Sequence, residues 1–210
     1  MNLPNKPPRC EQISWNKFAQ LARKVAFKIQ AAGFEPDLII AIARGGYMPA
    51  RVLADYLNVM NVASIKVEHY RGTKKSAKTI VRHALPENVR GKRVLVVDDV
   101  SDTGDTFDAA LPHIRARLPK AEIRTAVLLH KASCPDVPDF YAHKVVKWRW
   151  IIYPWAVIED LTAFLQEAKK PIKNVAAFAK LLQEQHGLHM PKSTLQDALD
   201  LSRITPHHRP

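Results

Sequence analysis

The stretch Val94-Leu-Val-Val-Asp-Asp-Val-Ser-Asp-Thr-Gly-Asp-Thr106 decides the fold of this chain. It opens on apolar, mainly β-branched residues, which are typical of a strand buried on both faces of a parallel sheet. Two adjacent acids, Asp98 and Asp99, follow the strand. Small residues then predict a tight turn from Ser101, and Thr106 begins a predicted helix. A buried strand, a turn and a helix in this order indicate one unit of an α/β protein.

The polar residues of this stretch suit a sugar phosphate. Adjacent carboxylates at a strand end, here Asp98 and Asp99, can hold two vicinal hydroxyls of a ribose, and one of them can hold Mg²⁺ through water. The turn from Ser101 to Thr106 offers backbone N–H groups, hydroxyls and a helix N-terminus, which together form an anion cradle. The stretch therefore predicts a site for ribose 5-phosphate. An ordinary strand, turn and well-capped helix is the alternative interpretation.

Outward from this stretch, apolar strands alternate with amphipathic helices. Ser14 is the predicted cap of a helix over 14–32, in which apolar residues recur at helical spacing. Strands are predicted at 37–43, 62–67, 79–83, 93–98, 123–129, 141–146 and 150–153, and further helices at 49–57 and 106–118. This alternation predicts a mostly parallel sheet flanked by helices. Ligands bind beyond the carboxyl ends of such strands, so chemistry is expected in the loops after Ala43, Asp98 and Leu129.

The pattern becomes purely helical toward the C-terminus. Helices are predicted over 159–169 and 173–186, with a last short helix from Ser193. Pro171 separates the first two, because proline disrupts the interior of a helix. We therefore predict one α/β domain over residues 1–168 and a helical C-terminal extension over 171–204.

Composition limits the class of protein. Of the 210 residues, 47% are hydrophobic and 25% are charged, which is the balance of a soluble globular protein. No run approaches the roughly 18 apolar residues of a membrane helix, so no membrane partner is expected. Cys10 and Cys134 stand far apart in no metal-like spacing, which predicts free thiols and a cytoplasmic location. The net charge of +12 favours anionic partners, such as phosphorylated metabolites or nucleic acid.

Residues 94–106 resemble the signature that binds 5-phosphoribosyl-1-pyrophosphate (PRPP) in type I phosphoribosyltransferases: a hydrophobic strand, two acids and a Thr-Gly-x-Thr phosphate loop. The resemblance covers residues 35–160 and implies the type I phosphoribosyltransferase fold, with a small hood formed by the termini. It implies that PRPP is bound by Asp98, Asp99, Ser101, Asp102, Thr103, Gly104, Asp105 and Thr106. Asp105 departs from the pattern, because the family usually has a second glycine there.

Ala43-Arg-Gly-Gly-Tyr-Met-Pro49 is similar to the pyrophosphate loop of the same family. By position, Arg44, Gly45 and Gly46 would bind pyrophosphate, because glycines let the backbone approach a phosphate and arginine adds charge. Relatives can have a non-proline cis peptide in this loop, for which Arg44–Gly45 is the expected bond. The basic loop from His69 to Lys78 matches the flexible lid of the family in position. A tight turn and a solvated basic loop are the alternative interpretations.

The later segments resemble the xanthine-guanine and hypoxanthine phosphoribosyltransferases. Lys131 matches a lysine that those enzymes place against the purine 6-oxygen, although a surface lysine at a strand end is the alternative. Lysine only donates hydrogen bonds, which favours a 6-oxo group over the 6-amino group of adenine. Trp150-Ile-Ile-Tyr-Pro-Trp155 matches a segment that stacks an aromatic ring on the base and faces its 2-position with backbone. Trp150 and Ile151 inherit those roles, with Trp148 as a rival for the stacking.

Asp102 lies where the 6-oxopurine enzymes carry an acid near purine N7, and proton transfer at N7 would help N9 attack the ribose. The resemblance thus implies that Asp102, Asp98 and Asp99 are catalytic and that Mg²⁺ binds at Asp99. The implied reaction of purine salvage transfers the phosphoribosyl group of PRPP to hypoxanthine, guanine or xanthine, giving a nucleoside monophosphate and pyrophosphate. A homo-oligomer, either a dimer or a tetramer, is expected.

A second hypothesis is a regulator of the same fold that senses PRPP or a nucleotide and binds nucleic acid. The predicted helices on either side of Gly187, with Lys180 and Lys192 nearby, would then form part of a helix-turn-helix. A packing or dimerisation pair of helices is the alternative interpretation of these segments, and the enzyme is not expected to bind nucleic acid. A pyrimidine acceptor is a third hypothesis.

Overall fold

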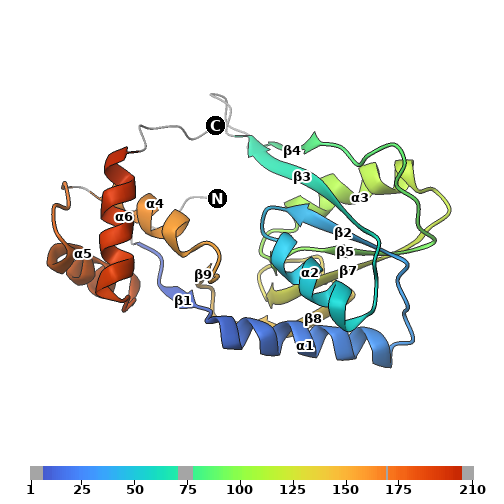
Figure 1. The fold of residues 1–210 in the computed structure, drawn as a ribbon, viewed down its shortest axis with the longest axis horizontal. Helices are drawn as coiled ribbons and strands as arrows, with labels where there is room; N and C mark the ends of the chain where they lie inside the picture. Colours follow the sequence, from blue (N-terminus) through green and yellow to red (C-terminus); the bar gives the residue numbers. More distant parts are fainter. Residues whose placement is uncertain (1–6, 71–77, 169, 205–210) are drawn as a thin grey trace. The chain divides into compact units, whose positions relative to one another are not determined.

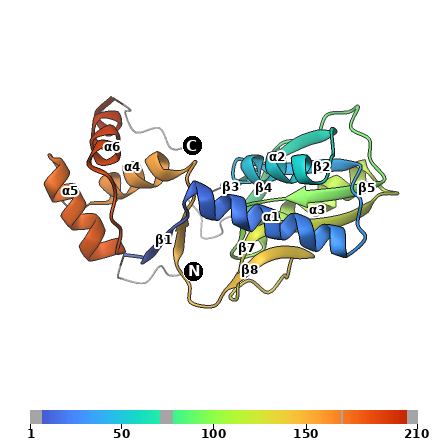
Figure 2. The same cartoon turned by 60° about the horizontal axis from the view of Figure 1, so that its bottom comes forward.

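The computed structural model describes residues 7–70, 78–168 and 170–204, which divide into two compact units. The larger unit comprises Phe18–Trp148. The smaller unit combines the segment up to Lys17 with the chain from Arg149 onward. Figures 1 and 2 show the larger unit as a sheet with helices on both faces, which confirms the predicted α/β class.

The sheet of the larger unit has seven strands in the order β4-β3-β2-β5-β7-β6, with β8 also paired to β7. Their bounds are β2 Leu38–Ala43, β3 Val62–Tyr70, β4 Lys78–His83, β5 Arg93–Val97, β6 Val100–Ser101, β7 Glu122–Lys131 and β8 Phe140–Val145. Each pair is parallel except β3 with β4. The carboxyl ends of β2, β5 and β7 therefore meet at one edge of the sheet, where the sequence predicts the chemistry.

Apolar side chains pack against both faces of this sheet. α3 covers one face, and α1 and α2 lie on the other (Figure 1). The bounds of these helices are α1 Trp15–Ala31, α2 Tyr47–Tyr56 and α3 Asp105–Arg117. Every residue of β2 is buried, and Ile42 belongs with Ile114 of α3 to one core. The hydroxyl of Ser14 accepts a hydrogen bond from the Lys17 N–H at 3.1 Å, which confirms it as the cap of α1.

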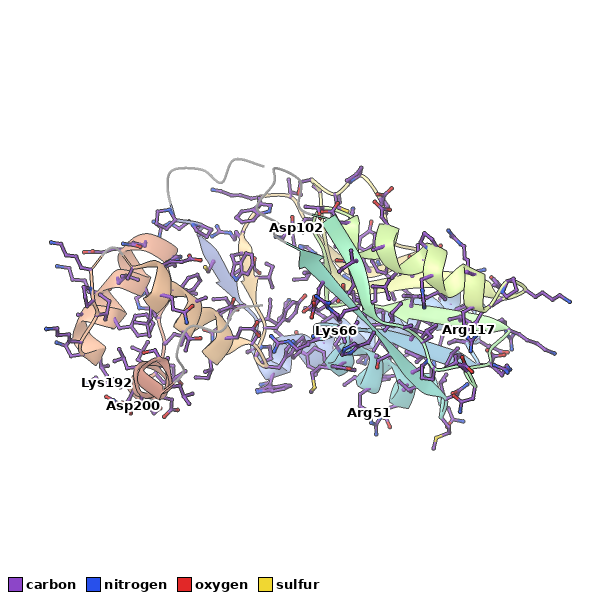
Figure 3. All side chains as sticks on the ribbon, turned by 90° about the horizontal axis from the view of Figure 1, so that it is seen from above. Arg51, Lys66, Asp102, Arg117, Lys192 and Asp200 are labelled. Atoms are coloured by element: carbon purple, nitrogen blue, oxygen red, sulfur yellow. The ribbon has the colours of Figure 1, made fainter. Side chains whose placement is uncertain are left out.

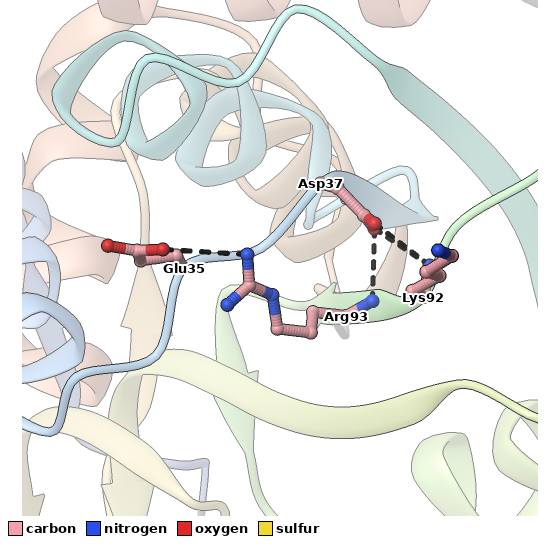
Figure 4. A network of polar contacts seen from close by, with 4 residues as sticks. All are labelled: Glu35, Asp37, Lys92 and Arg93. Atoms are coloured by element: carbon pink, nitrogen blue, oxygen red, sulfur yellow. Dashed lines mark hydrogen bonds and ion pairs between the residues drawn. The ribbon is translucent and has the colours of Figure 1, made fainter.

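A polar network fixes β2 and β5 at the amino ends of the two strands (Figure 4). The Asp37 carboxylate accepts hydrogen bonds from the backbone N–H groups of Lys92, at 2.9 and 3.0 Å, and Arg93, at 3.0 Å. The Arg93 guanidinium also lies 3.5 Å from the Glu35 carboxylate. These contacts hold the parallel register of β2 and β5. Because one register runs the length of both strands, the network also decides which residues meet at the carboxyl edge.

The smaller unit has a two-stranded parallel sheet and a helical core. Its elements are β1 Cys10–Gln12, β9 Trp150–Ile152, α4 Val157–Glu167, α5 Val175–Leu181, the π-helix η1 Leu182–His186 and α6 Lys192–Ile204. The helices after residue 170 share one core with β9 and α4, which includes Ile152, Leu161, Phe164, Phe178, Leu182, Leu195 and Leu199. The predicted domains, 1–168 and 171–204, stay a prediction. The boundaries of the two compact units differ from them and fall after Lys17 and after Trp148.

Some elements differ from the sequence prediction. β1 and β6 escape prediction because strands of two or three residues are too short to show a period. The helix predicted over 173–186 begins later, after Asn174, whose side chain accepts a hydrogen bond from the Ala177 N–H at 2.9 Å. It changes to a π-helix at Leu182 and ends at Gly187, whose φ is 71°. In the parts of the chain that the structure describes, no helix is long and apolar enough to cross a membrane.

Candidate active site

Two neighbouring glycines bring the loop after β2 against the end of β5. A Cβ atom on Gly45 would lie 2.5 Å from Oδ2 of Asp99, which is closer than side chains approach one another. A Cβ atom on Gly46 would run into backbone oxygens of β5 and β2. Only glycine therefore lets this loop lie against the acid pair, whereas its predicted contact with pyrophosphate stays a prediction. The cis peptide joins Ala43 to Arg44, so the position predicted for it is wrong by one residue.

The acid pair at the end of β5 is electrostatically costly. Asp98 is 9% exposed, and one of its carboxylate oxygens accepts a hydrogen bond from the Asp99 N–H at 2.9 Å. Burial first, and the neighbouring charge of Asp99 second, raise the pKa of Asp98 well above its usual range. A cation or a hydroxyl donor would offset this cost, because either interaction favours the ionised carboxylate. The pair therefore favours a ligand that brings positive charge or hydroxyl groups.

The turn after the acid pair encloses a pocket of about 190 Å³. Its lining residues are nearly consecutive in the sequence: Asp98, Asp99, Val100, Ser101, Asp102, Thr103, Gly104, Thr106 and Phe107. Gly104 has a left-handed backbone, with φ of 94°, which turns the chain into α3. Asp105 is not among the lining residues, and its carboxylate accepts a hydrogen bond from the Thr103 hydroxyl at 3.0 Å. The departure from the family pattern thus lies outside the pocket wall, and the N–H groups at the start of α3 suit a phosphate.

The short strand β6 brings Asp102 to Lys131. In the parallel register of β6 and β7, Ser101 pairs with His130, so Asp102, directly after β6, lies near Lys131 at the end of β7. Lys131 is 3% exposed, and its Nζ lies 2.5 Å from Oδ2 of Asp102 (Asp102 is labelled in Figure 3). A buried ammonium requires such a partner, because an unpaired charge in this position would be strongly destabilising. Lys131 is therefore not the surface lysine of the alternative interpretation.

Trp148 completes a cluster with these two side chains. Its indole N–H donates a hydrogen bond to Oδ1 of Asp102 at 3.0 Å. The Lys131 ammonium lies 4.4 Å from the centroid of the indole ring, which is a cation–π contact. The sequence marks Trp148 only as a rival for stacking, because no local pattern reports a contact with a residue 46 positions away.

His130 is a site neighbour that sequence reasoning does not find. Its buried ring makes a hydrogen bond of 2.9 Å with the Ser101 hydroxyl. Burial, followed by the nearby charge of Lys144, lowers the pKa of His130. The neutral ring therefore ties the turn from Ser101 to Thr106, the phosphate turn, to β7. Its position directly before Lys131 at a strand end is the only signal that the sequence offers.

Charged side chains on β3 and β4 are a second feature that the sequence does not reveal. Lys66 pairs with Ala43 in the register of β3 and β2, beside the glycine loop. Its Nζ lies 2.6 Å from Glu68, which also accepts a hydrogen bond from the Arg82 guanidinium at 2.9 Å. These bonds, that from Lys66 first, lower the pKa of Glu68 to about 2. Of the predicted lid over 69–78, Arg71, Lys74 and Lys75 lie outside the described residues.

The residues predicted to hold the base divide between the two units. Trp150 and Ile151 belong to β9 of the smaller unit, and Trp150 is 42% exposed. Its indole N–H donates a hydrogen bond of 2.9 Å to the Asp160 carboxylate. Burial is the first cause that raises the pKa of Asp160, to about 6, while the bond from Trp150 lowers it and the charge of Glu159 raises it further. Asp160 is another residue that sequence reasoning does not single out.

The acid pair supplies the carboxylates that a metal ion would need. Among the described residues, no group of three or more His, Cys, Asp and Glu side chains could hold a metal ion. Asp98 and Asp99 supply two carboxylates, and Mg²⁺ typically takes one or two of these together with water and substrate phosphates. The acid pair therefore fits Mg²⁺ that is shared with a substrate. The two cysteines are free and buried, and neither belongs to this donor set.

One edge of the sheet thus carries the glycine loop, the acid pair, the phosphate turn and the buried lysine. Comparison with known proteins identifies the family. The family model for the phosphoribosyl transferase domain matches residues 12–160. This chain belongs to the phosphoribosyltransferase family. The predicted type I phosphoribosyltransferase fold is thereby confirmed.

The relatives of this phosphoribosyltransferase include purine enzymes. It is 31% identical to the xanthine-guanine phosphoribosyltransferase of Idiomarina loihiensis over 143 residues, which are 68% of this chain and 84% of the relative. A purine phosphoribosyltransferase from Pyrococcus horikoshii is 32% identical, with a TM-score of 0.60 over 70% of this chain and 93% of the other. A hypothetical protein from Neisseria gonorrhoeae, solved with bound ppGpp, is 28% identical, with a TM-score of 0.60 over 70% and 89%.

Proposed function

We propose that this protein transfers the 5-phosphoribosyl group of PRPP to a 6-oxopurine, giving the nucleoside monophosphate and pyrophosphate, as in purine salvage. The observation that carries the proposal is the buried Lys131 paired with Asp102 at the carboxyl end of β7. The names of the relatives from Idiomarina loihiensis and Pyrococcus horikoshii support a purine acceptor.

Lys131 selects the 6-position by the polarity of its hydrogen bonds. An ammonium group has only donors, and its nearly complete burial leaves no water to accept them. A 6-oxo group accepts such a bond, whereas the 6-amino group of adenine would present a second donor. Leaving a buried polar group unpaired rejects a ligand by several orders of magnitude in favourable cases. Hypoxanthine and guanine should therefore be used far better than adenine.

Asp102 handles the proton of the purine imidazole ring. Its carboxylate takes the proton from N7 of the base, which leaves the electron pair of N9 free to attack C1 of the ribose. The N9–C1 bond forms while the bond from C1 to the pyrophosphate oxygen breaks, and the pyrophosphate leaves with the bonding electrons. The proton then resides on Asp102 until it passes to water.

The other site residues hold PRPP. Asp98 and Asp99 bind the two ribose hydroxyls, whose donor groups offset the cost of the buried acid pair. The turn from Ser101 to Thr106 binds the 5-phosphate through the N-terminus of α3. The loop from Arg44 to Gly46 binds pyrophosphate. Mg²⁺ held at Asp99 would neutralise the charge of the departing pyrophosphate.

The ring of Trp150 is proposed to stack on the base, and the backbone of Ile151 is proposed to face the 2-position of the base. Stacking on an aromatic ring is worth about 1–3 kcal/mol per base. A backbone carbonyl at Ile151 would accept from the 2-amino group of guanine and repel the 2-oxo group of xanthine. We therefore expect guanine and hypoxanthine to be used ahead of xanthine.

The direct test is a panel of bases incubated with PRPP and Mg²⁺, with nucleotide and pyrophosphate measured by chromatography. Guanine, hypoxanthine and xanthine should yield nucleotide, adenine and pyrimidines should not, and chelation of Mg²⁺ should stop the reaction. Adenine used as readily as hypoxanthine would refute the role of Lys131. Light scattering on the same sample tests the expected dimer or tetramer.

The regulator hypothesis gains little from the extension. Residues 171–204 carry four basic side chains, Lys173, Lys180, Lys192 and Arg203, and three acidic ones, Glu184, Asp197 and Asp200. This near balance is not the basic surface that a nucleic-acid-binding segment requires. Retention on DNA that collapses with rising salt would favour the regulator; the enzyme should show none.

A further inference from the structure

We infer that, in the free enzyme, Trp148 contacts the two side chains that are proposed to recognise the base, Asp102 and Lys131, and that it must release Asp102 before a purine binds. The inference rests on the proposed function, because it takes Asp102 and Lys131 as the groups that recognise the base. It assigns Trp148 as a residue that competes with the base for Asp102 and Lys131, which differs from the stacking role that the sequence analysis considers.

The contacts of Asp102 carry the argument. One carboxylate oxygen, Oδ2, lies against the Lys131 ammonium at 2.5 Å, and the other, Oδ1, accepts from the Trp148 indole N–H at 3.0 Å. Both oxygens are therefore engaged. A purine that donates its N7 proton to Asp102 must approach an oxygen that the ammonium or the indole already contacts, so one of the two partners must give way.

The indole of Trp148 resembles a purine in its contacts. Both are fused five- and six-membered rings, and in both an N–H of the five-membered ring can donate to a carboxylate. The π face of Trp148 also lies 4.4 Å from the Lys131 ammonium, which satisfies the cation in place of a 6-oxo group. One side chain thus meets the two groups that the base is proposed to use.

Burial decides which partner gives way. Lys131 is 3% exposed and cannot leave Asp102 without becoming an unpaired buried charge. Trp148 is 41% exposed, so its indole N–H can bond to water after it turns away. The exchange of Trp148 for a base is therefore far less costly than the exchange of Lys131. A base must still compete with the indole, which weakens the binding of every purine that displaces it by the same factor.

Trp148→Phe tests the indole N–H apart from the aromatic ring, because phenylalanine keeps an aromatic face and lacks the N–H donor. Trp148→Leu removes both, and Val146→Ala is a matched control at a residue that is 82% exposed. We expect the KM for hypoxanthine to fall about tenfold in Trp148→Phe, which corresponds to about 1.4 kcal/mol. The KM for PRPP and kcat should stay within about twofold, and Val146→Ala should match the wild type.

NMR of the indole N–H groups gives a readout that does not depend on turnover. The chain has four tryptophans, and Trp148→Phe assigns the resonance of this one by its absence. Addition of hypoxanthine with pyrophosphate and Mg²⁺ should move that resonance toward the position of a water-exposed indole. In the free protein, Asp102→Asn should move it as well, because the charged acceptor is lost.

The sign of the change in KM decides the inference. A higher KM for hypoxanthine in Trp148→Phe and in Trp148→Leu would mean that the ring stacks on the base, and an unchanged KM would mean that it does not meet the base; either result overturns competition. If the wild type uses none of the 6-oxopurines, the proposed function fails and the inference falls with it. If the wild type uses them and only the KM effect is missing, the inference alone fails.

Discussion

Two tryptophans that stand two positions apart in the sequence make the same bond in different surroundings. Trp148, the last residue of the larger unit, donates its indole N–H to Asp102, and Trp150, in the smaller unit, donates to Asp160. Asp102 also forms an ion pair with Lys131. Among the residues that the structure describes, Asp160 has no cationic partner, and burial raises its pKa to about 6.

The difference separates an acid arranged for chemistry from an acid whose charge is a cost of folding. The Asp102 carboxylate is held in place by the Lys131 ammonium and the Trp148 indole N–H. A buried carboxylate with one neutral donor titrates near neutral pH instead. The same pair of residue types therefore belongs to the candidate site in one unit and is a pH-sensitive contact in the other.

The largest effect is expected where the acids of the larger unit are removed together. The double variant Asp98→Asn and Asp99→Asn should lower kcat about a thousandfold, because the proposed ligands of the ribose hydroxyls and of Mg²⁺ are lost. Steady-state kinetics with PRPP and hypoxanthine measure the loss. The near-isosteric change should leave the fold intact, since burial of these charges is costly in the wild type.

Asp160→Asn is the matched control for that variant. It replaces an acid of the smaller unit by the same amide, and it keeps an oxygen that can accept the Trp150 indole N–H. Its kcat should stay within a few-fold of the wild type. Near-normal turnover in the double variant would remove the acid pair from the mechanism, and an equal loss in both variants would remove the distinction between the two units.

The second prediction removes the cation that distinguishes the two pairs. Lys131→Met should lower kcat/KM for hypoxanthine about a hundredfold, or about 2.7 kcal/mol, because Asp102 loses its ion pair and the base loses its donor. Discrimination against adenine should fall in the same variant. Competition assays with the two bases measure both. A variant that keeps the wild-type preference for hypoxanthine would show that another residue reads the 6-position.

These pairs also show how far the sequence predicts the site. The acid pair, the glycine loop and the phosphate turn are each local, so their residue types and order along one segment are enough to predict them. Lys131 could be named from its place after a strand. Its burial and its bond to Asp102 depend on the two-residue strand β6 and its register with β7, and such a short strand leaves no period in the sequence.

The smaller unit was harder to predict for a related reason. Its core joins β9 and α4 to helices beyond Pro171, and proline marks a break in the chain without reporting what packs across it. The π-helix at 182–186 has the same apolar residues that an α-helix would have. Asp160 is unremarkable in the sequence because its pKa depends on burial beside Trp150, which only the packing of α4 reveals.

The third prediction concerns stability and tests the cost of the Asp160 charge. The folded pKa of about 6 lies above the ordinary value of 3.8, so the folded state binds the proton more tightly than the unfolded state. Stability should therefore fall as the pH rises from about 4 to about 6 and stay low above that range. At about pH 8, Asp160→Asn should raise the free energy of unfolding by about 1–3 kcal/mol.

Urea unfolding of the wild type and Asp160→Asn at a series of pH values measures this difference. The gain should shrink as the pH falls toward about 4, because the wild-type carboxyl is then protonated in the folded protein. A gain that is constant over the whole range would trace to packing rather than to titration. A loss at about pH 8 would show that the ionised carboxylate has a favourable partner.

The smallest effect is expected from the indole of the smaller unit. Trp150→Phe removes the N–H that favours the ionised form of Asp160, so the pKa of that carboxyl should rise above about 6. The rise should stay below about one unit, since one hydrogen bond to a partly exposed ring is worth about 1 kcal/mol. Carbon-detected NMR titration of the Asp160 carboxyl, assigned with Asp160→Asn, measures this rise.

The control is Trp148→Phe, which makes the same chemical change at the other pair and should leave the pKa of Asp160 unchanged. If both variants move the pKa of Asp160 equally, the two tryptophan–aspartate pairs are coupled; if neither does, the indole bond does not set the titration and burial alone accounts for it.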